Sequence, residues 1–270
     1  MFPASFEYRR ATTIAEAVSV LSNDEDAKLL AGGHSLLPLM KLRLASPSTL
    51  VDIGGLGELS YVRKEGSEVA IGALTRHRDL EISPVLVAEA PVLSAVAGQI
   101  GDPSVRHRGT IGGSVAHGDG ASDLPAALLA LDAKMVAEGP AGRREIPAGD
   151  FFRGFLETAL EPDEILVEIK VPAGYRDFSF KKFNRRAQDW AIVGVVAVRA
   201  PETRVAYINM GATPLRAQAV EARLSSGSGV DEACEVADEG LNPPSDINAS
   251  SEYRRHLAKV LVKRALIELG

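Results

Sequence analysis

Two Gly-Gly pairs, each followed closely by a hydroxyl side chain, constrain this chain more than any other feature. The first lies in residues 31–35 (AGGHS), between a short apolar run that favours a strand and the helical pattern of residues 36–44. The second lies in residues 110–114 (TIGGS). Glycine adopts positive φ readily and lets a ligand approach the backbone closely. Each pair alone is more often an ordinary tight turn, so the meaning of one depends on the other.

Loops of this kind favour a bound anion, because their exposed N–H groups and the following helix N-terminus carry partial positive charge. Ser35, Thr110 and Ser114 add hydroxyl donors. Two such loops facing each other predict a site for the doubly negative pyrophosphate of a dinucleotide. Neither loop matches a P-loop, and no Gly-x-Gly-x-x-Gly segment occurs, so a Rossmann site has no support.

The first 55 residues predict a small parallel unit. Thr13 and Glu16 have the spacing of a capping box, and apolar residues follow them at helical spacing. A strand is expected at 27–31, then the glycine loop, a helix at 36–44 and a second strand at 50–53. The order is therefore helix, strand, glycine loop, helix, strand.

Residues 56–172 predict a second, mixed unit. Its start is marked by the glycines at 54–57, and a hairpin is expected to join strands at 59–63 and 68–71. The other expected elements are helices that begin at Pro84 and Pro91, the second ending at Gly101, a helix at 123–131, and strands at 134–137 and 165–171.

Residues 173–270 predict a third unit with a three-stranded antiparallel sheet and helices. The strands are expected at 178–184, 191–198 and 204–209, and the helices at 217–224, 231–239 and 252–269. The predicted fold class is α+β, with three parts at 1–55, 56–172 and 173–270. The first two parts form one ligand-binding domain, a small parallel βαβ unit beside a mixed or antiparallel sheet.

Charge and cysteine content exclude several classes of protein. A net charge of −6 argues against a general nucleic-acid binder, and no apolar stretch is long enough to span a membrane. Residues 1–7 lack the basic and apolar regions of a signal peptide, so a cytoplasmic location is expected. Cys234 is the only cysteine, which excludes an internal disulfide, a cysteine-based zinc site and an iron–sulfur cluster held by this chain.

The ordered set of motifs resembles the FAD-binding medium subunit of molybdenum hydroxylases, a family that includes carbon monoxide, xanthine and N-heterocycle dehydrogenases. The two glycine segments resemble its paired FAD motifs, and the likeness extends over essentially the whole chain. The supporting segments are residues 6–8 (FEY), 50–53 (LVDI), 71–75 (IGALT), 122–123 (SD) and 182–191 (KFNRRAQDWA). Within the family, residues 31–38 (AGGHSLLP) and 185–191 (RRAQDWA) are most similar to the carbon monoxide dehydrogenase branch.

The resemblance implies which residues hold FAD. The pyrophosphate is expected against the two glycine segments, and Asp123 is expected to accept hydrogen bonds from sugar or ribityl hydroxyls, unless it is only a helix cap. Leu166 and one lysine of the pair at 181–182 are expected near the ring system, and which lysine is left open. The implied cofactor-binding residues are Leu29, Leu30, Ala31, Gly32, Gly33, His34, Ser35, Leu36, Thr110, Ile111, Gly112, Gly113, Ser114, Asp123, Leu166 and Lys182.

The resemblance also implies a role within a larger enzyme. A large subunit oxidises the substrate at a molybdopterin cofactor, and two [2Fe–2S] clusters on a small subunit carry the electrons to FAD on this chain. The final acceptor is external, a quinone, NAD or oxygen, and the assembly is a dimer of heterotrimers. Flavin subunits of N-heterocycle, aromatic or aldehyde-oxidising hydroxylases are the alternative. A stand-alone flavin oxidoreductase lacks a substrate domain here, and a cofactor-free scaffold is at odds with two complete glycine motifs.

This chain departs from the family at one position in the loop after the second glycine segment. Many members have a proline three residues before the aspartate, whereas this chain has Gly120, which predicts a looser loop there. His77, His107 and His117 are expected to pack in the surface or core, while Trp190 is assigned either to core packing or to the flavin's surroundings. The basic run at 106–108 is either a solvated turn, a lining of the FAD phosphates or a subunit contact.

Overall fold

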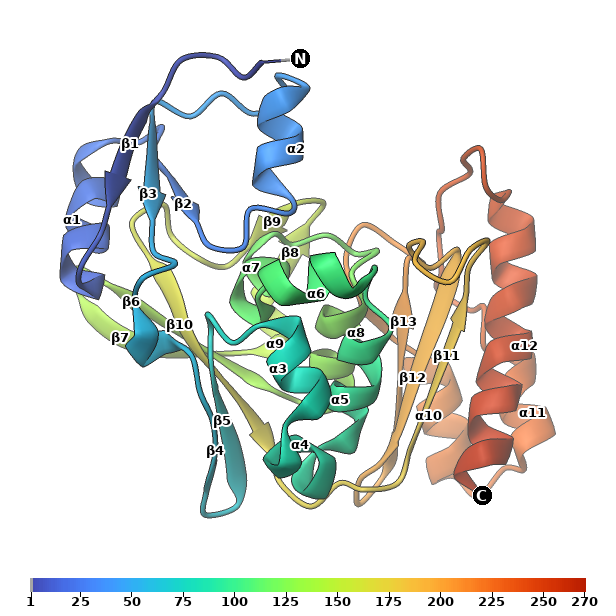
Figure 1. The fold of residues 1–270 in the computed structure, drawn as a ribbon. Coiled ribbons are helices and arrows are strands. Elements are labelled where there is room, and N and C mark those ends of the chain that lie inside the picture. The colour runs from blue at the N-terminus through green and yellow to red at the C-terminus, as the bar shows by residue number, and fades with distance from the viewer. Residues whose placement is uncertain (1) are drawn as a thin grey trace.

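The N-terminal part is a three-stranded parallel sheet with a helix on either side, in a computed structural model that describes residues 2–270. Its strands are β1 (Glu7–Arg10), β2 (Lys28–Leu30) and β3 (Thr49–Asp52), in the order β1-β3-β2. Helix α1 (Ile14–Asn23) begins at Thr13, whose hydroxyl accepts a hydrogen bond from the Glu16 amide. Helix α2 (Leu36–Lys41) follows β2 across the first glycine segment (Figure 1).

The sequence predicted this unit except for its first strand. β1 was missed because all four of its residues are exposed, so it shows no apolar alternation; the parallel register Tyr8 with Leu50 holds it in place instead. Helix α2 ends at Lys41, three residues before the predicted end. Leu50 and Val51 of the central strand are fully buried, which explains why that strand was readily predicted.

The second part is a five-stranded antiparallel sheet of order β4-β5-β10-β6-β7. The predicted hairpin is present, with Gly66 at φ 59° in its turn. Strand β10 lies at the centre and carries a bulge between Leu166 and Glu168. The bounds are β4 (Val62–Glu65), β5 (Glu68–Gly72), β6 (Lys134–Gly139), β7 (Gly142–Pro147) and β10 (Ile165–Pro172), with a small hairpin β8 (Phe152–Gly154) and β9 (Glu157–Thr158).

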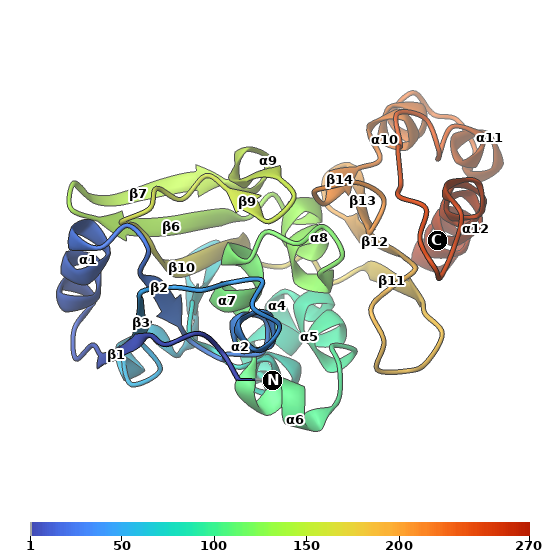
Figure 2. The ribbon, with the colours of Figure 1, turned by 90° about the horizontal axis from the view of Figure 1, so that it is seen from above.

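Short helices cover one face of this sheet and separate it from the C-terminal sheet (Figure 2). Pro84, Pro91 and Pro103 each stand in the first turn of a helix, where the missing N–H costs nothing. The helices are α3 (His77–Ile82), α4 (Pro84–Glu89), α5 (Pro91–Gly98), α6 (Pro103–Arg108), α7 (Ile111–Ala116), α8 (Asp123–Ala130) and α9 (Ala148–Phe151). All residues of α8 are buried, since the C-terminal sheet and the helices α5, α7 and α9 pack around it.

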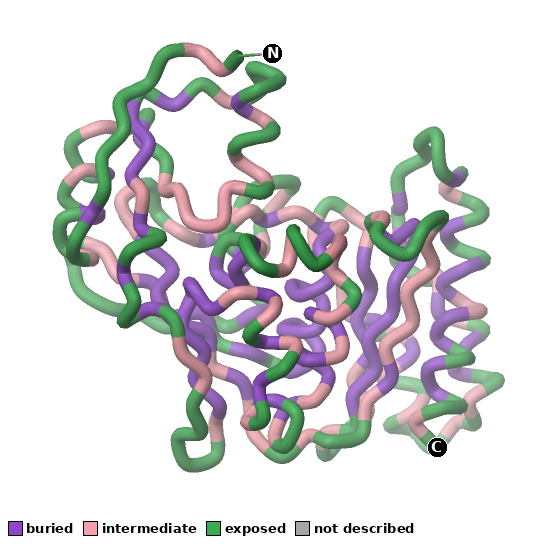
Figure 3. The backbone as a smooth tube through the Cα atoms, in the orientation of Figure 1, coloured by how far each residue is buried: buried purple, intermediate pink, exposed green. Residues whose placement is uncertain are grey.

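The third part is an antiparallel sheet of order β11-β12-β13-β14 packed on three helices. Its three long strands were predicted, and the two-residue β14 extends the sheet by one strand. The bounds are β11 (Phe178–Phe183), β12 (Val193–Arg199), β13 (Thr203–Ile208), β14 (Leu215–Arg216), α10 (Gln218–Ser225), α11 (Val230–Glu235) and α12 (Ser251–Leu269). Figure 3 shows buried stretches running through β12 and β13, because helices cover both faces of this sheet.

Within residues 2–270, no helix combines the length and apolar character that crossing a membrane requires.

Candidate functional site

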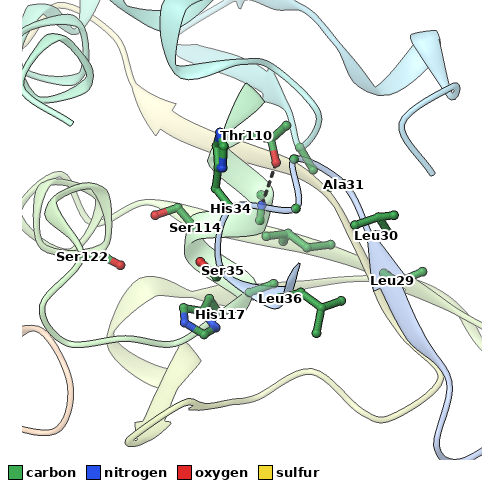
Figure 4. A pocket seen from close by; sticks show the side chains of 18 of the residues that line it. Leu29, Leu30, Ala31, His34, Ser35, Leu36, Thr110, Ser114, His117 and Ser122 are labelled. Atoms are coloured by element: carbon green, nitrogen blue, oxygen red, sulfur yellow. Dashed lines mark hydrogen bonds between the residues drawn. The ribbon is translucent and has the colours of Figure 1, made fainter. Parts of the chain in front are cut away.

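A cavity of about 610 Å³ lies where the three parts of the chain meet. This volume falls within the roughly 300–1,000 Å³ typical of cofactor sites. The first glycine segment forms one wall and α7 another, while β10 and the segment from β11 to Trp190 complete it. Figure 4 shows Leu29 and Leu30 on β2, with Ser114, His117 and Ser122 on the opposite side of the glycine loop.

The first glycine segment presents free backbone donors to the cavity. Gly33 has φ 76°, a conformation that favours glycine, and the turn places the Gly33 carbonyl against the Leu37 amide at 3.1 Å. The amides of Gly32, Gly33 and His34 donate to no carbonyl or side chain of residues 2–270. Successive free N–H groups before a helix form a concave anion site, so this segment fits the predicted phosphate cradle.

The second glycine segment differs from the prediction because it is the first turn of α7. The Ile111 amide donates to the Thr75 carbonyl at 3.0 Å, and the Gly112 amide to the Ala73 carbonyl at 2.8 Å. The Gly113 amide is engaged by the Thr110 hydroxyl at 3.1 Å (Figure 4). These amides are therefore unavailable to a phosphate, and the segment offers hydroxyls and a small surface instead.

Ile111 is the one implied residue that does not line the cavity. Its side chain is fully buried in the core between the sheet and the helices. The side chain anchors α7 in this core, and a cofactor contact of Ile111 stays a prediction. The other fifteen of the sixteen implied residues all lie on the cavity wall.

One glycine of each segment allows the backbone to lie very close to a neighbouring part of the chain. A Cβ on Gly32 would collide with the Arg108 carbonyl oxygen and would lie 2.9 Å from the Gly109 Cα. A Cβ on Gly112 would lie 2.5 Å from the Cβ of Ala73. Both neighbours are rigid parts of the backbone or core, so neither can rotate away. Gly32 and Gly112 are thus both required for close approach, each to a different neighbour.

Asp123 and Lys182 form a buried ion pair at another side of the cavity. The Lys182 Nζ lies 2.6 Å from Asp123 Oδ2 and 3.0 Å from the Gln99 carbonyl oxygen. The two side chains are 6% and 3% exposed, and Asp123 Oδ1 has no hydrogen-bond partner among residues 2–270. Burial raises the pKa of Asp123, while Lys182 opposes that shift. Because Asp123 lines the cavity, this buried acceptor is available to a hydroxyl or N–H of a ligand.

The structure decides two alternatives that the sequence left open. Lys182 faces the cavity, whereas its neighbour Lys181 pairs with Glu268 on α12, because successive residues of β11 point to opposite faces. Asp123 is the first residue of α8, but its carboxylate binds Lys182, and Ser122 holds the cap position without a side-chain bond. A role as a plain helix cap is therefore not observed.

Several residues outside the implied set also line the cavity. His77, His117 and Ser122 do so, and Trp190 lies on the wall with 57% of its surface exposed, which excludes core packing. None of the three residues at 106–108 is on the wall, and Arg106 pairs with Glu81 at 3.1 Å. No local pattern marks these wall residues, since they come from α3, α7 and loops that meet only in the folded chain.

The environment of His77 predicts that the folded protein loses stability in acid. Burial, then the positive charge of His34 and Arg106, lowers the pKa of His77 to about 4. In the unfolded chain His77 is protonated below about pH 6.5, whereas in the folded chain it stays neutral until about pH 4. The free energy of unfolding therefore decreases as the pH falls from about 6.5 towards 4. We expect this group alone to cost about 2 kcal/mol between pH 7 and pH 5.

Urea unfolding at the two pH values, compared between the wild type and the His77→Gln variant, measures this effect. The variant should lose less stability on acidification by that amount. Equal losses in the two proteins would show that His77 is freely protonated in the folded state.

The free backbone amides and apolar walls of the cavity suit a protein that binds an anionic cofactor. Comparison with known proteins gives the family. The model for the FAD binding domain in molybdopterin dehydrogenase matches residues 4–174, and the model for the CO dehydrogenase flavoprotein C-terminal domain matches residues 178–269. The chain belongs to the FAD-binding medium subunits of molybdenum hydroxylases, and is an oxidoreductase subunit of that family.

Individual relatives are similar over nearly their whole length. The carbon monoxide dehydrogenase medium chain of Hydrogenophaga pseudoflava is 42% identical, covering 98% of this chain and 97% of that protein. The glyceraldehyde dehydrogenase medium chain of Sulfolobus acidocaldarius is 37% identical over 100% of both. The solved carbon monoxide dehydrogenase of Hydrogenophaga pseudoflava, in a form lacking the Mo-pyranopterin moiety, superimposes with a TM-score of 0.96 at 43% identity, covering 100% of this chain and 98% of that one.

The residues of the cavity fit FAD. Free amides in the first glycine segment suit a pyrophosphate, and Leu29, Leu30 and Leu166 supply apolar walls for the rings. The unpaired Oδ1 of Asp123 suits a hydroxyl of the cofactor. The family membership and the wall chemistry thus agree.

Proposed function

We propose that this chain is the FAD-carrying electron-transfer subunit of an aerobic carbon monoxide dehydrogenase. In this role it passes electrons from the [2Fe–2S] clusters of a small partner subunit to an external acceptor, a quinone, NAD or oxygen. A large subunit would carry the molybdopterin cofactor, in a cytoplasmic dimer of heterotrimers. The observation that supports the flavin site is a single cavity lined by the unbonded backbone amides of the first glycine segment and by the buried Asp123–Lys182 ion pair.

In the proposed site, each chemical group of FAD has residues of matching chemistry on the cavity wall. The amides of Gly32 to His34 and the hydroxyls of Ser35 and Ser114 would hold the phosphates, and Asp123 would accept a hydrogen bond from a hydroxyl. Lys182 would supply a cation near the ring system. FAD supplies the redox chemistry by accepting and releasing electrons, and the chain supplies binding, orientation and charge.

Carbon monoxide is proposed as the substrate of the whole enzyme because of the 42% identity to a carbon monoxide dehydrogenase medium chain. The 37% identity to a glyceraldehyde dehydrogenase medium chain keeps an aldehyde-oxidising enzyme as the alternative. The cavity itself does not discriminate between them, since in the proposed enzyme the substrate reacts on another subunit.

We also propose a division into parts 1–55, 56–172 and 173–270. Each part contains its own sheet, and the third has a separate apolar core between its sheet and α12. A larger core joins the second part to the near face of the third, which would keep the cavity walls in fixed positions.

The native complex provides the test of the proposed function. We expect a preparation purified through this chain to contain one FAD per chain, iron–sulfur absorbance and molybdopterin, and carbon monoxide to bleach its flavin absorbance without air. Glyceraldehyde, added to a second sample, should leave the flavin oxidised. Bleaching by glyceraldehyde but not by carbon monoxide would overturn the substrate and keep the electron-transfer role. A complex with FMN, or with no flavin, would overturn the role itself.

A further inference from the structure

Asn209 ties together the two segments that carry the buried ion pair of the cavity. It follows β13 and has φ 61°, a conformation in which asparagine is among the few tolerated residues. Its backbone N–H donates to the Gly120 carbonyl at 2.8 Å, and its side-chain Nδ2 donates to the Ala191 carbonyl at 2.7 Å. Arg254 on α12 donates to the carbonyl of Asn209 at 3.4 Å. One residue thereby connects the loop before α8, the segment before β12 and a C-terminal helix.

Gly120 makes the first of these contacts possible. A Cβ at this position would lie 2.8 Å from the Gly211 carbonyl oxygen and 2.9 Å from that of Ala212. Both are backbone atoms, so they cannot turn aside. The loop is therefore buried and held against the turn after β13, rather than loosened by the absence of a proline.

The contacts of Asn209 join the same two chain segments as the Asp123–Lys182 ion pair. Asp123 lies three residues after Gly120, and Lys182 and Trp190 lie on the chain segment that ends at Ala191. The Asp123–Lys182 pair joins these two segments on the cavity side, and Asn209 joins them from behind. Helix α8 also packs on β12 and β13, so Asn209 adds a direct hydrogen-bonded link to that packing.

We propose that Asn209 is a positioning residue for the cofactor site, which holds the Asp123 loop and the segment from Lys182 to Trp190 at the separation that FAD requires. Asn209 itself does not line the cavity. The inference rests on the proposed FAD site, and it assigns the C-terminal sheet a part in holding FAD.

The test measures the FAD affinity of the native complex with the Asn209→Asp variant and compares it with that of the wild-type complex. Aspartate keeps the size, the backbone conformation and the N–H bond to Gly120, but its carboxylate cannot donate to the Ala191 carbonyl. We expect the dissociation constant for FAD to rise about tenfold, the size that a lost buried hydrogen bond implies. Gly120→Ala should weaken FAD binding in the same direction. The visible circular dichroism of the flavin should change in both variants, since the walls around it shift.

Two control variants separate positioning from loss of stability. Asp246→Asn removes the ionic partner of buried Arg254, at 2.7 Å, and leaves the contacts of Asn209 with Gly120 and Ala191 in place. It should lower the melting temperature and keep FAD affinity. Asn23→Asp removes a similar but exposed hydrogen bond, from the Asn23 side chain to the Ser19 carbonyl in α1. It should change neither the melting temperature nor the FAD affinity.

The outcomes are distinct. Unchanged FAD affinity in Asn209→Asp, or an equal loss in Asp246→Asn at a matched melting temperature, would overturn the positioning role. A wild-type complex that binds no FAD would instead overturn the proposed function.

Discussion

Gly32→Ala is expected to weaken FAD binding roughly 10- to 100-fold, as strain of about 1–3 kcal/mol implies. The added Cβ would meet the Arg108 carbonyl oxygen and the Gly109 Cα, which belong to the backbone and cannot rotate away. The strain is relieved only if the first glycine segment moves away from Arg108 and Gly109. That movement displaces the free amides of Gly32, Gly33 and His34 from their position in the cavity.

Gly149→Ala is the matched control. Gly149 lies in α9 with nothing within 4 Å of an added Cβ and with an ordinary backbone conformation. We expect it to bind FAD like the wild type, with equal or higher thermal stability, because alanine restricts the unfolded chain. Equilibrium dialysis of FAD against the native complex, with a melting curve for each variant, measures both. Wild-type affinity in Gly32→Ala would show that FAD binding does not need the close approach of Gly32 to Arg108 and Gly109.

The glycine motifs illustrate how far local sequence reasoning reaches. Both pairs were placed at the site, because their composition is local information. The state of their amides was not predictable, since it depends on residues distant in sequence. The carbonyls of Thr75 and Ala73 accept from the second segment, whereas no group within residues 2–270 accepts from the first three amides after Ala31. The pairs therefore serve different purposes, one as a donor surface and the other as a tightly packed helix start.

Burial and exposure explain most of the remaining differences. Strand β1 is exposed at every residue and was missed, whereas the apolar strands around Leu50 and Ile169 were predicted. The choice between Lys181 and Lys182 needed the face of β11 that the cavity occupies. Asn209 and Gly120 had no local signal for their contact, because they meet only after the C-terminal sheet has packed against α8.

Asp123→Ala is expected to lower the free energy of unfolding by about 3–5 kcal/mol and to abolish FAD binding. The reason is that Lys182, with a 3% exposed side chain, would remain as a buried charge without its partner. Glu145→Ala is the comparison on the surface, because Glu145 pairs with Lys170 at 2.6 Å but is 46% exposed. Exposed pairs contribute about 0–1 kcal/mol, so that variant should be nearly as stable as the wild type. Chemical denaturation at pH 7 measures both changes.

A double variant, Asp123→Leu with Lys182→Met, separates the cofactor role of the pair from its structural role. Replacing a buried ion pair by apolar residues of similar volume is often neutral or stabilising, so the double variant should regain most of the stability lost by Asp123→Ala. It should not regain FAD binding, because neither the acceptor Oδ1 nor the lysine charge is restored. Stability and FAD affinity that recover together would mean that the pair only fills space, and would remove Asp123 and Lys182 from the proposed site.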